Sequence, residues 1–339
     1  MRKKTTRKIL VFFLLLAATA VCAMSACDSR ALRSDQREIH SASEQVPPVN
    51  SEQQPVATKT VNHILGQTEI PVDPQRIVVL DATSEFLLDG LLALGLKPVG
   101  LTRCPSCMNS DPFSEILGGL PNIGTDEQPS LERILKLKPD LILGYEWQES
   151  FYSQLSEIAP TVIVNPYAGG NDFKRNFRQL AEILGKSDEV DSILAEYNER
   201  IQNFRQRFGE KLRNKTVSLL TFSSSGFHVH GPEYLFIARV MSDAGIQFIP
   251  AYKALKDGGQ LNMSIEVLPN WDADFLFMEL FQKDSLEEFE SVVVKQPLWF
   301  TLKAVRNDQV YIITKYPSGG PIGASQFIDD LSEYFSSKL

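Results

Sequence analysis

The chain has 339 residues, of which 43% are apolar and 9% aromatic, so it has room for two globular domains with buried cores. Its formal net charge is −8, and no basic stripe with interleaved aromatic residues offsets that balance. The composition therefore argues against a nucleic-acid-binding protein.

Residues 1–26 have the features of a secretory signal. A basic start, MRKKTTRKIL, leads into an apolar run from Ile9 to Val21 that is too short for a membrane-spanning helix. Met24-Ser25-Ala26-Cys27 resembles the lipobox of bacterial lipoproteins, with Met where Leu is usual, which implies lipidation of Cys27 after cleavage. Cys22 is the alternative, but bulky Val21 precedes it. Cleavage before Cys27 would remove five basic residues and no acidic ones, lowering the net charge from −8 to −13. We expect an extracytoplasmic protein, in the periplasm or at the cell surface, that is anchored to the cytoplasmic membrane by lipid.

The mature chain begins with a tether and a first lobe. Ser, Gln, Glu and Pro dominate residues 27–59, which predicts a flexible segment with little to bury. Between residues 60 and 186, short apolar runs alternate with helical patterns, as in a parallel sheet covered on both faces. The expected elements are a hairpin, strands at 77–80, 98–101, 141–144 and 161–164, and helices at 84–94, 130–137, 151–160 and 173–184.

The segment from Ser187 to Phe208 has apolar residues at spacings of three, four and seven, which predicts one long amphipathic helix. Ser187 can cap its start, acidic residues follow in the first turn, and Gly209 is expected to end it. About 21 residues at 1.5 Å each give a rod of roughly 31 Å, longer than the usual connection inside a compact α/β domain. We therefore assign residues 187–209 as a connecting helix between two lobes.

The second lobe, residues 210–339, repeats part of the first. Residues 130–143 and 264–277 align without a gap at an offset of 134, matching Ser130 with Ser264, Glu132 with Glu266 and Asp140 with Asp274. Chance similarity between two helix-strand units is the alternative.

The predicted fold is two Rossmann-like α/β/α lobes joined by a single long helix, with a ligand cleft between them at the carboxyl ends of the strands. The second lobe is expected to contain strands at 216–222, 247–249, 275–280 and 310–314 and helices at 234–245, 285–293 and 324–338.

Several ordered motifs give the chain a family resemblance over residues 60–339. GQTEIPVDPQRIVVLDATSEFLLDGLLALGLKPVG, IGTDEQPSLERILKLKPDLILG, LSEIAPTVIV and LWFTLKAVRNDQVYII resemble the periplasmic binding proteins of ferric-siderophore and cobalamin ABC importers. The resemblance implies an extracytoplasmic receptor that delivers an iron-siderophore complex to a membrane permease. In that family one Glu on each lobe engages Arg residues of the permease, and these positions match Glu132 and Glu266.

The internal repeat supports the same docking interpretation, because it places one carboxylate at an equivalent point on each lobe. Such a pair suits a two-fold or pseudo-two-fold partner such as a permease dimer. The alternative is that both are first-turn Glu residues that stabilise a helix N-terminus.

Large aromatic, polar-tipped and cationic side chains follow the ends of the expected strands. Aromatic walls with an Arg or Lys would suit a ferric siderophore, which is bulky, partly apolar and commonly anionic. Packing within a lobe is the alternative for each residue. The candidates are Arg103, Tyr145, Trp147, Tyr167, Phe227, His228, His230, Tyr252, Phe281, Trp299, Lys315 and Tyr316.

Two small clusters leave alternatives open. Cys104 and Cys107 are expected to form a disulfide in an oxidising compartment, with a redox pair or metal ligation as the alternatives. His228 and His230 face one way on an extended segment, but they lack a clear third and fourth zinc ligand. Contact with the ligand, an ordinary structural role or axial ligation of haem are the other interpretations.

No catalytic motif stands out, since the chain has no Gly-x-Ser-x-Gly elbow, phosphate loop or His-Glu-x-x-His sequence. We therefore expect a monomeric binding protein, not an enzyme, with no cofactor beyond the iron of its bound siderophore. The alternatives are the same architecture binding cobalamin or haem, and a thiol- or metal-dependent extracytoplasmic protein built on Cys104 and Cys107.

Overall fold

The computed structural model describes residues 57–83, 86–104, 113, 119–168, 170–255, 259–280, 285–315 and 317–339, all within one compact unit. The signal segment and nearly all of the tether lie outside these ranges. In the part of the chain that is described, no helix combines the length and apolar character needed to cross a membrane.

The first lobe is built on a four-stranded parallel sheet with the order β4-β3-β5-β6. Every residue of its four strands is buried, as the continuous apolar runs predicted. An antiparallel hairpin of β1 and β2 precedes the sheet. The strands are β1 (Thr58–His63), β2 (Gly66–Pro71), β3 (Ile77–Val79), β4 (Gly100–Leu101), β5 (Leu141–Tyr145) and β6 (Thr161–Val164). The helices are α1 (Leu87–Ala93), α3 (Leu131–Leu137), the 3₁₀ helix η1 (Glu146–Phe151), α4 (Tyr152–Ile158) and α5 (Phe173–Leu184).

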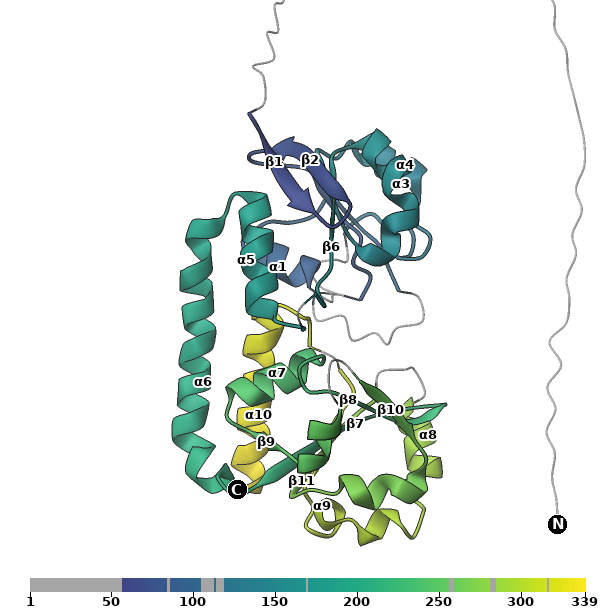
Figure 1. Cartoon of the computed structure of the whole chain (residues 1–339), viewed down its shortest axis with the longest axis vertical. Helices are drawn as coiled ribbons and strands as arrows, with labels where there is room; N and C mark the ends of the chain where they lie inside the picture. Colours follow the sequence, from purple (N-terminus) through teal and green to yellow (C-terminus); the bar gives the residue numbers. More distant parts are fainter. Residues whose placement is uncertain are drawn as a thin grey trace, which may run out of the picture. The chain divides into compact units, whose positions relative to one another are not determined.

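A single long helix links the lobes, as predicted (Figure 1). It is α6 (Val190–Leu212), 23 residues long and preceded by a 3₁₀ turn, η2 (Ser187–Glu189). The prediction that Gly209 ends this helix was wrong. Leu212 lies four residues after Phe208 and is also buried, so the apolar stripe continues for another turn. Its burial offsets the cost of about 1 kcal/mol that an interior Gly imposes on a helix.

The second lobe has a mixed sheet with the order β10-β8-β7-β11-β12, and β9 pairs with the first residues of β7. Strands β7, β11 and β12 are parallel, whereas β8 is antiparallel to both of its neighbours. We did not predict β10, because three of its four residues are exposed and it has no apolar run. The strands are β7 (Thr216–Ser223), β8 (Gly226–His230), β9 (Gln247–Phe248), β10 (Gln260–Met263), β11 (Phe275–Glu279) and β12 (Val310–Ile313). The helices are α7 (Phe236–Asp243), η3 (Pro250–Ala254), η4 (Ile265–Trp271), α8 (Ser285–Val292), η5 (Trp299–Thr301), α9 (Lys303–Arg306) and α10 (Pro321–Lys338).

The two Asp residues of the internal repeat perform the same task in the two lobes. Asp140, just before β5, accepts hydrogen bonds from the backbone N–H of Arg76 at 2.8 Å and of its neighbour Gln75 at 2.7 Å. Asp274, just before β11, accepts one from the N–H of Thr216 at 3.1 Å. Each Asp thus ties the start of its own strand to the start of the neighbouring parallel strand, β3 or β7.

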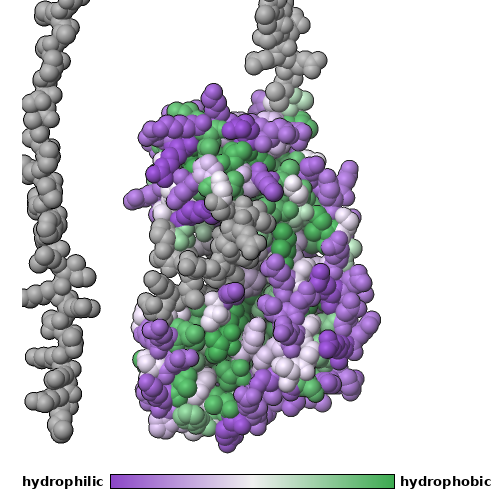
Figure 2. Space-filling model, turned by 180° about the vertical axis from the view of Figure 1, so that it is seen from behind, coloured by the Kyte–Doolittle hydropathy of each residue, from purple (hydrophilic) through white to green (hydrophobic). Residues whose placement is uncertain are grey.

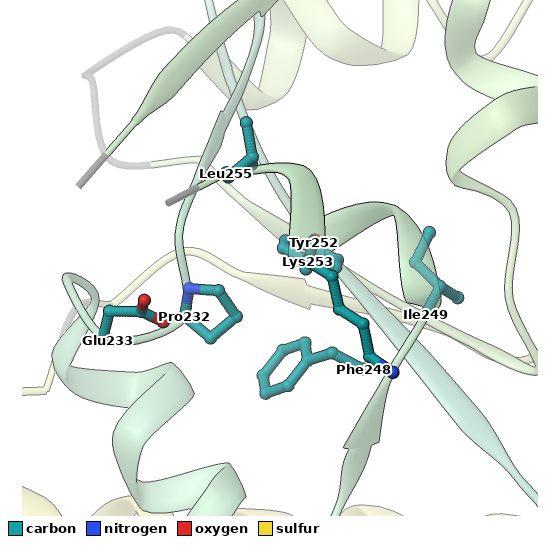
Figure 3. Close-up of a pocket in the computed structure, with 7 residues that line it drawn as sticks. All are labelled: Pro232, Glu233, Phe248, Ile249, Tyr252, Lys253 and Leu255. Atoms are coloured by element: carbon teal, nitrogen blue, oxygen red, sulfur yellow. The ribbon is translucent and has the colours of Figure 1, made fainter. Parts of the chain in front are cut away.

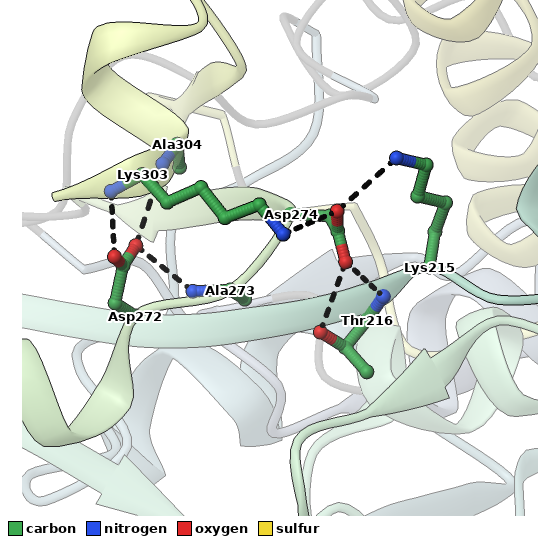
Figure 4. A network of polar contacts seen from close by, with 7 residues as sticks. All are labelled: Lys215, Thr216, Asp272, Ala273, Asp274, Lys303 and Ala304. Atoms are coloured by element: carbon green, nitrogen blue, oxygen red, sulfur yellow. Dashed lines mark hydrogen bonds and ion pairs between the residues drawn. The ribbon is translucent and has the colours of Figure 1, made fainter.

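Asp274 also lies at the centre of a polar network (Figure 4). Lys303 Nζ approaches its carboxylate to 2.9 Å and Lys215 Nζ to 3.2 Å. Burial acts to raise the pKa of Asp274, but hydrogen bonds from Lys303, Thr216 and Lys215 outweigh it and lower the pKa to about 2. The helix before the strand differs between the repeats: α3 is an α-helix, whereas η4 contains Pro269, which has no backbone N–H to donate.

Helix α10 makes a second connection between the lobes, because it packs against α6 and α7 and also against α1 and α5 of the first lobe. Phe173 of the first lobe and Phe335 of α10 belong to the same apolar core. Asp89 of α1 is fully buried and accepts hydrogen bonds from Ser318 Oγ, from the N–H of Ile322 at 3.0 Å and from the N–H of Gly323 at 2.8 Å. This carboxyl therefore binds the start of an 18-residue helix, where unpaired N–H groups and the helix dipole favour an acceptor.

The surface is mostly hydrophilic on the face shown in Figure 2, with apolar side chains gathered in smaller patches. Among the described residues, the large apolar side chains that remain exposed include Leu135 on α3 and Val267 on η4. These two lie on the helices that carry Glu132 and Glu266.

Candidate functional site

The carboxyl ends of the two sheets open onto a shared region of the molecule. The chain leaves β3 toward α1, and it leaves β12 toward α10. Asp89 in the first turn of α1 contacts Ser318 and the first turn of α10, so the helices that follow β3 and β12 meet. Ligands of open α/β sheets bind at this edge of the strands, which makes the region the candidate site.

An aromatic pair lies at the end of β5. Tyr145 is fully buried, and its hydroxyl oxygen accepts a hydrogen bond from the N–H of Leu87 at 2.9 Å. Trp147 stacks on it with ring centroids 4.4 Å apart and an angle of 29° between the planes, yet 40% of Trp147 is exposed. The buried Tyr holds the partly exposed indole in place, so the pair forms a fixed aromatic surface at this edge of the sheet.

Three further candidates surround the same edge of the first sheet. Arg103 follows β4 and is half-buried, with its backbone N–H donating to Gly124 O at 2.8 Å. Tyr167 follows β6, and its N–H donates to Asn165 Oδ1 at 2.8 Å. Cys104 is disulfide-bonded, whereas Cys107, its expected partner, lies outside the described residues.

Three aromatic candidates of the second lobe are buried in its core. The ring of Phe227 lies 5.2 Å from that of Phe222, and Trp299 lies edge-on to Phe289 at 5.3 Å. Tyr252 is 5% exposed. These three residues therefore pack within the lobe, which is the alternative that the sequence left open. Phe281 and Tyr316 lie outside the described residues, as does the lipidation candidate Cys27.

Strands β8 and β9 pair with opposite ends of the same edge of β7 and leave a gap between them. Tyr252 fills this gap. Its hydroxyl accepts a hydrogen bond from Leu219 N–H at 2.7 Å and donates one to Leu219 O at 2.6 Å, in place of a neighbouring strand. Beside it lies a cavity of about 430 Å³ with one acidic and one basic side chain (Figure 3). The cavity is lined by Pro232, Glu233, Phe248, Ile249, Tyr252, Lys253 and Leu255.

The two histidines occupy one face of β8, as expected, and His228 contacts polar side chains. His228 Nε2 lies 2.8 Å from Ser223 Oγ, and its Nδ1 lies 2.8 Å from Asn262 Oδ1. Burial lowers the pKa of His230, with the nearby His228 adding to the effect. Within the described ranges, no group of three His, Cys, Asp or Glu side chains could hold a metal ion.

Two buried carboxyl groups at strand ends were not among the sequence candidates. Asp126 accepts hydrogen bonds from Thr102 Oγ1 at 2.5 Å and from Ala82 N–H at 3.1 Å, and burial raises its pKa to about 6. Glu279, the last residue of β11, is fully buried, and burial raises its pKa to about 8. A single acid within an otherwise apolar run, FLFMEL, was the signal that could have identified Glu279.

Glu132 and Glu266 are both exposed, each in the first turn of its helix. Their surroundings differ. Lys136 Nζ pairs with Glu132 Oε1 at 2.7 Å, and this contact lowers the pKa of Glu132. For Glu266, a hydrogen bond from Ser264 is the main cause of a lowered pKa. The alternative role at a helix N-terminus fits their positions as well as docking does.

Known proteins similar to this chain agree on one family. YfiY of Bacillus subtilis, whose name describes a probable siderophore-binding lipoprotein, is 31% identical, with 98% of each chain covered. An achromobactin-binding periplasmic protein of Dickeya dadantii is 29% identical over 76% of this chain and 86% of its own. Staphylococcus aureus SirA, solved in complex with staphyloferrin B, has 27% identity and a TM-score of 0.68, covering 82% of this chain and 99% of SirA. The family described as periplasmic binding protein matches residues 77–317, and the chain belongs to that family of binding proteins.

Proposed function

We propose that this protein is a lipid-anchored extracytoplasmic receptor that binds a ferric siderophore and delivers it to an ABC permease. The observation that carries the proposal is the similarity to YfiY, which is named for siderophore binding, over 98% of the chain. Relatives named for ferric citrate and ferric hydroxamate binding support the same ligand class. We infer that the protein acts as a monomer, anchored through Cys27.

The ligand is proposed to bind between lobe 60–186 and lobe 210–339, at the carboxyl ends of both sheets. The exposed face of Trp147 supplies an aromatic wall at the end of β5. Tyr167 follows the neighbouring strand β6, and Arg103 follows β4 at the opposite side of the sheet. An aromatic surface and a guanidinium at the same edge of the sheet suit a bulky, anionic iron chelate. Phe281 and Tyr316 remain candidates, and Cys104 with Cys107 is proposed to brace the loop after β4.

Tryptophan fluorescence tests ligand binding, because the three Trp residues differ in exposure. Trp147 is 40% exposed, whereas Trp271 and Trp299 are 6% and 5% exposed. We expect saturable quenching by at least one of ferric citrate, a ferric trihydroxamate and a ferric tricatecholate. Trp147→Phe should remove most of the signal, and equilibrium dialysis of radioactive iron with this variant separates loss of signal from loss of binding. No binding of any of the three complexes would contradict the proposal.

Delivery to the permease is proposed to use Glu132 and Glu266, one on each lobe. Both carboxylates are exposed at matched positions of the repeat, next to the exposed apolar residues Leu135 and Val267. Glu132→Gln and Glu266→Gln should each weaken binding to the permease in detergent or nanodiscs while leaving siderophore affinity unchanged. Glu266→Gln should have the larger effect, because Lys136 already neutralises part of the charge at Glu132.

A further inference from the structure

The carboxyl group of Glu279 is only partly satisfied. Thr221 Oγ1 donates a hydrogen bond to its Oε2 at 2.6 Å, whereas Oε1 has no hydrogen-bond partner in the described structure. Glu279 is fully buried, and a buried polar atom without a partner costs stability. An apolar residue of similar volume would avoid that cost, so the carboxyl calls for a reason other than stability.

The protonation state of Glu279 defines what its free oxygen can do. Burial raises its pKa to about 8, and the hydrogen bond from Thr221 acts in the opposite direction. At neutral pH the carboxyl is therefore mostly protonated. Because Oε2 accepts the Thr221 hydrogen, the proton belongs on Oε1, which then becomes a hydrogen-bond donor without an acceptor.

Glu279 is one end of a polar row that crosses the sheet. In the strand register Glu279 pairs with Thr221, Thr221 with His228, and His228 with Asn262, so the four side chains share one face. His228 and Asn262 contact each other at 2.8 Å. The row lies at the carboxyl end of β7 and β11, the edge at which ligands of such sheets bind.

Among the described residues, burial and the Thr221 hydrogen bond set the pKa of Glu279, and no cation contributes to it. On β7 it faces Thr221, and on β12 it pairs with Ile313. Tyr252 of η3 is near enough for the charge of Glu279 to raise its pKa further, although burial is the main cause of that rise. His228 lies one strand beyond Thr221, on the same face.

We propose that Glu279 contacts the ligand, donating a hydrogen bond from Oε1 to an oxygen atom of the bound ferric chelate. The inference rests on the proposed function, since ferric siderophores present hard, partly anionic oxygen atoms. A neutral carboxyl donates to such an oxygen without the repulsion that a carboxylate would cause, and the low dielectric of a buried site strengthens the bond. The competing interpretation is that a buried water molecule satisfies Oε1 and that the ligand never reaches it.

Two substitutions at Glu279 separate these interpretations. Glu279→Leu removes the donor, and at pH 7 we expect at least a tenfold loss of affinity for whichever of the three ferric complexes binds the wild type. Glu279→Gln keeps an N–H donor, so its affinity at pH 7 should stay within about threefold of the wild type. Met278→Leu is the matched control, because Met278 is equally buried on the opposite face of β11 and the exchange conserves volume.

The pH profile and infrared difference spectra add readouts that a structural role would not change. As the pH rises from 7 to 9, Glu279 loses its proton, so wild-type affinity should fall while that of Glu279→Gln stays constant. The C=O stretch of the neutral carboxyl, which Glu279→Gln lacks, should shift when the chelate binds.

Each outcome decides the inference. If Glu279→Leu binds the chelate as tightly as the wild type does, the proposed contact is wrong. If the Leu and Gln variants lose affinity equally, Glu279 does not act as a hydrogen-bond donor. If the wild type binds none of the three complexes, the proposed function and this inference fall together. Unchanged affinity in Glu279→Leu with normal wild-type binding removes this inference alone.

Discussion

Two buried carboxyl groups, Asp89 between the lobes and Glu279 at the end of β11, are equally hidden from solvent but differ in their partners. Asp89 accepts hydrogen bonds from Ser318, Ile322 and Gly323, whereas Thr221 is the one donor to Glu279 in the described structure. Burial raises the pKa of both groups. Burial alone therefore does not identify a functional acid. Asp89, whose oxygen atoms are hydrogen-bonded, connects the lobes, whereas Glu279, with an oxygen atom that lacks a partner in the described structure, is the candidate for ligand contact.

The contact between Asp89 and the first turn of α10 also depends on two glycines. A Cβ on Gly320 would lie 2.3 Å from Asp89 Oδ1, and one on Gly323 would lie 1.9 Å from the backbone O of Ser318. Both distances are shorter than real contacts allow, so the first turn of α10 can reach Asp89 only without side chains at these positions. Glu279 has no comparable enclosure of backbone donors in the described structure.

The largest effect is expected for Asp89→Ala. It leaves the N–H groups of Ile322 and Gly323 buried without an acceptor at a helix N-terminus, so we expect the free energy of unfolding to fall by about 3–5 kcal/mol. Urea denaturation followed by circular dichroism measures this loss. Asp330→Ala, at an exposed position of α10, is a control that should change stability by less than about 1 kcal/mol. A loss below about 1 kcal/mol in Asp89→Ala would mean that this carboxyl does not hold the lobes together.

The next effect is expected for Gly320→Ala, which places a methyl group against the Asp89 carboxyl. Overpacking of this kind costs about 1–3 kcal/mol. Gly209→Ala is the matched control: nothing lies within 4 Å of its Cβ position in α6, and Ala favours a helix over Gly by about 1 kcal/mol. Thermal unfolding should therefore show opposite signs for the two exchanges. Equal shifts would mean that the approach of α10 to Asp89 is not tight.

The sequence predicted the elements that depend on local pattern. Helix α5 begins at Phe173 and ends at Leu184 as expected, because Asp172 caps its first turn and Gly185 adopts a left-handed conformation at its end. The buried strands β5 and β6 and the matched roles of Asp140 and Asp274 also follow from short stretches of chain.

Features that depend on contacts between distant segments escaped prediction. Asp89 and Ser318 are 229 residues apart, and nothing near either residue indicates the other. An aromatic residue near a strand end carries no sign of the face it occupies, so Tyr252 could not be distinguished from Trp147. Tyr252 fills a gap in the sheet, whereas Trp147 remains exposed.

A smaller effect, which depends on pH, is expected for Glu279→Gln. The folded-state pKa of about 8 lies above the ordinary value of 4.5, so the folded protein holds a proton that the unfolded chain releases. Wild-type stability should therefore decline as the pH rises from about 5 to about 8, by up to a few kcal/mol. The Gln variant lacks this decline, so its melting temperature should gain on the wild type across that range. Parallel curves between pH 5 and 8 would mean that Glu279 is ionised throughout.

The smallest effect comes from removing one hydroxyl donor at each carboxyl, Thr221→Val beside Glu279 and Ser318→Ala beside Asp89. Each should cost about 1 kcal/mol of stability, measured by urea denaturation. Asp89 keeps the two backbone N–H donors of Ile322 and Gly323, so Ser318→Ala should leave siderophore affinity within about twofold.

Glu279 keeps no donor in the described structure after Thr221→Val, and nothing then orients its Oε1–H. We expect siderophore affinity to fall by about twofold to fivefold, a few tenths of a kcal/mol to 1 kcal/mol, since 1.4 kcal/mol corresponds to a factor of ten. The Thr221 hydrogen bond lowers the pKa of Glu279, so its loss should also move the decline in stability to higher pH. If both variants change affinity to the same extent, the two carboxyl groups do not differ in kind, and the unpartnered oxygen of Glu279 is a structural cost without a ligand.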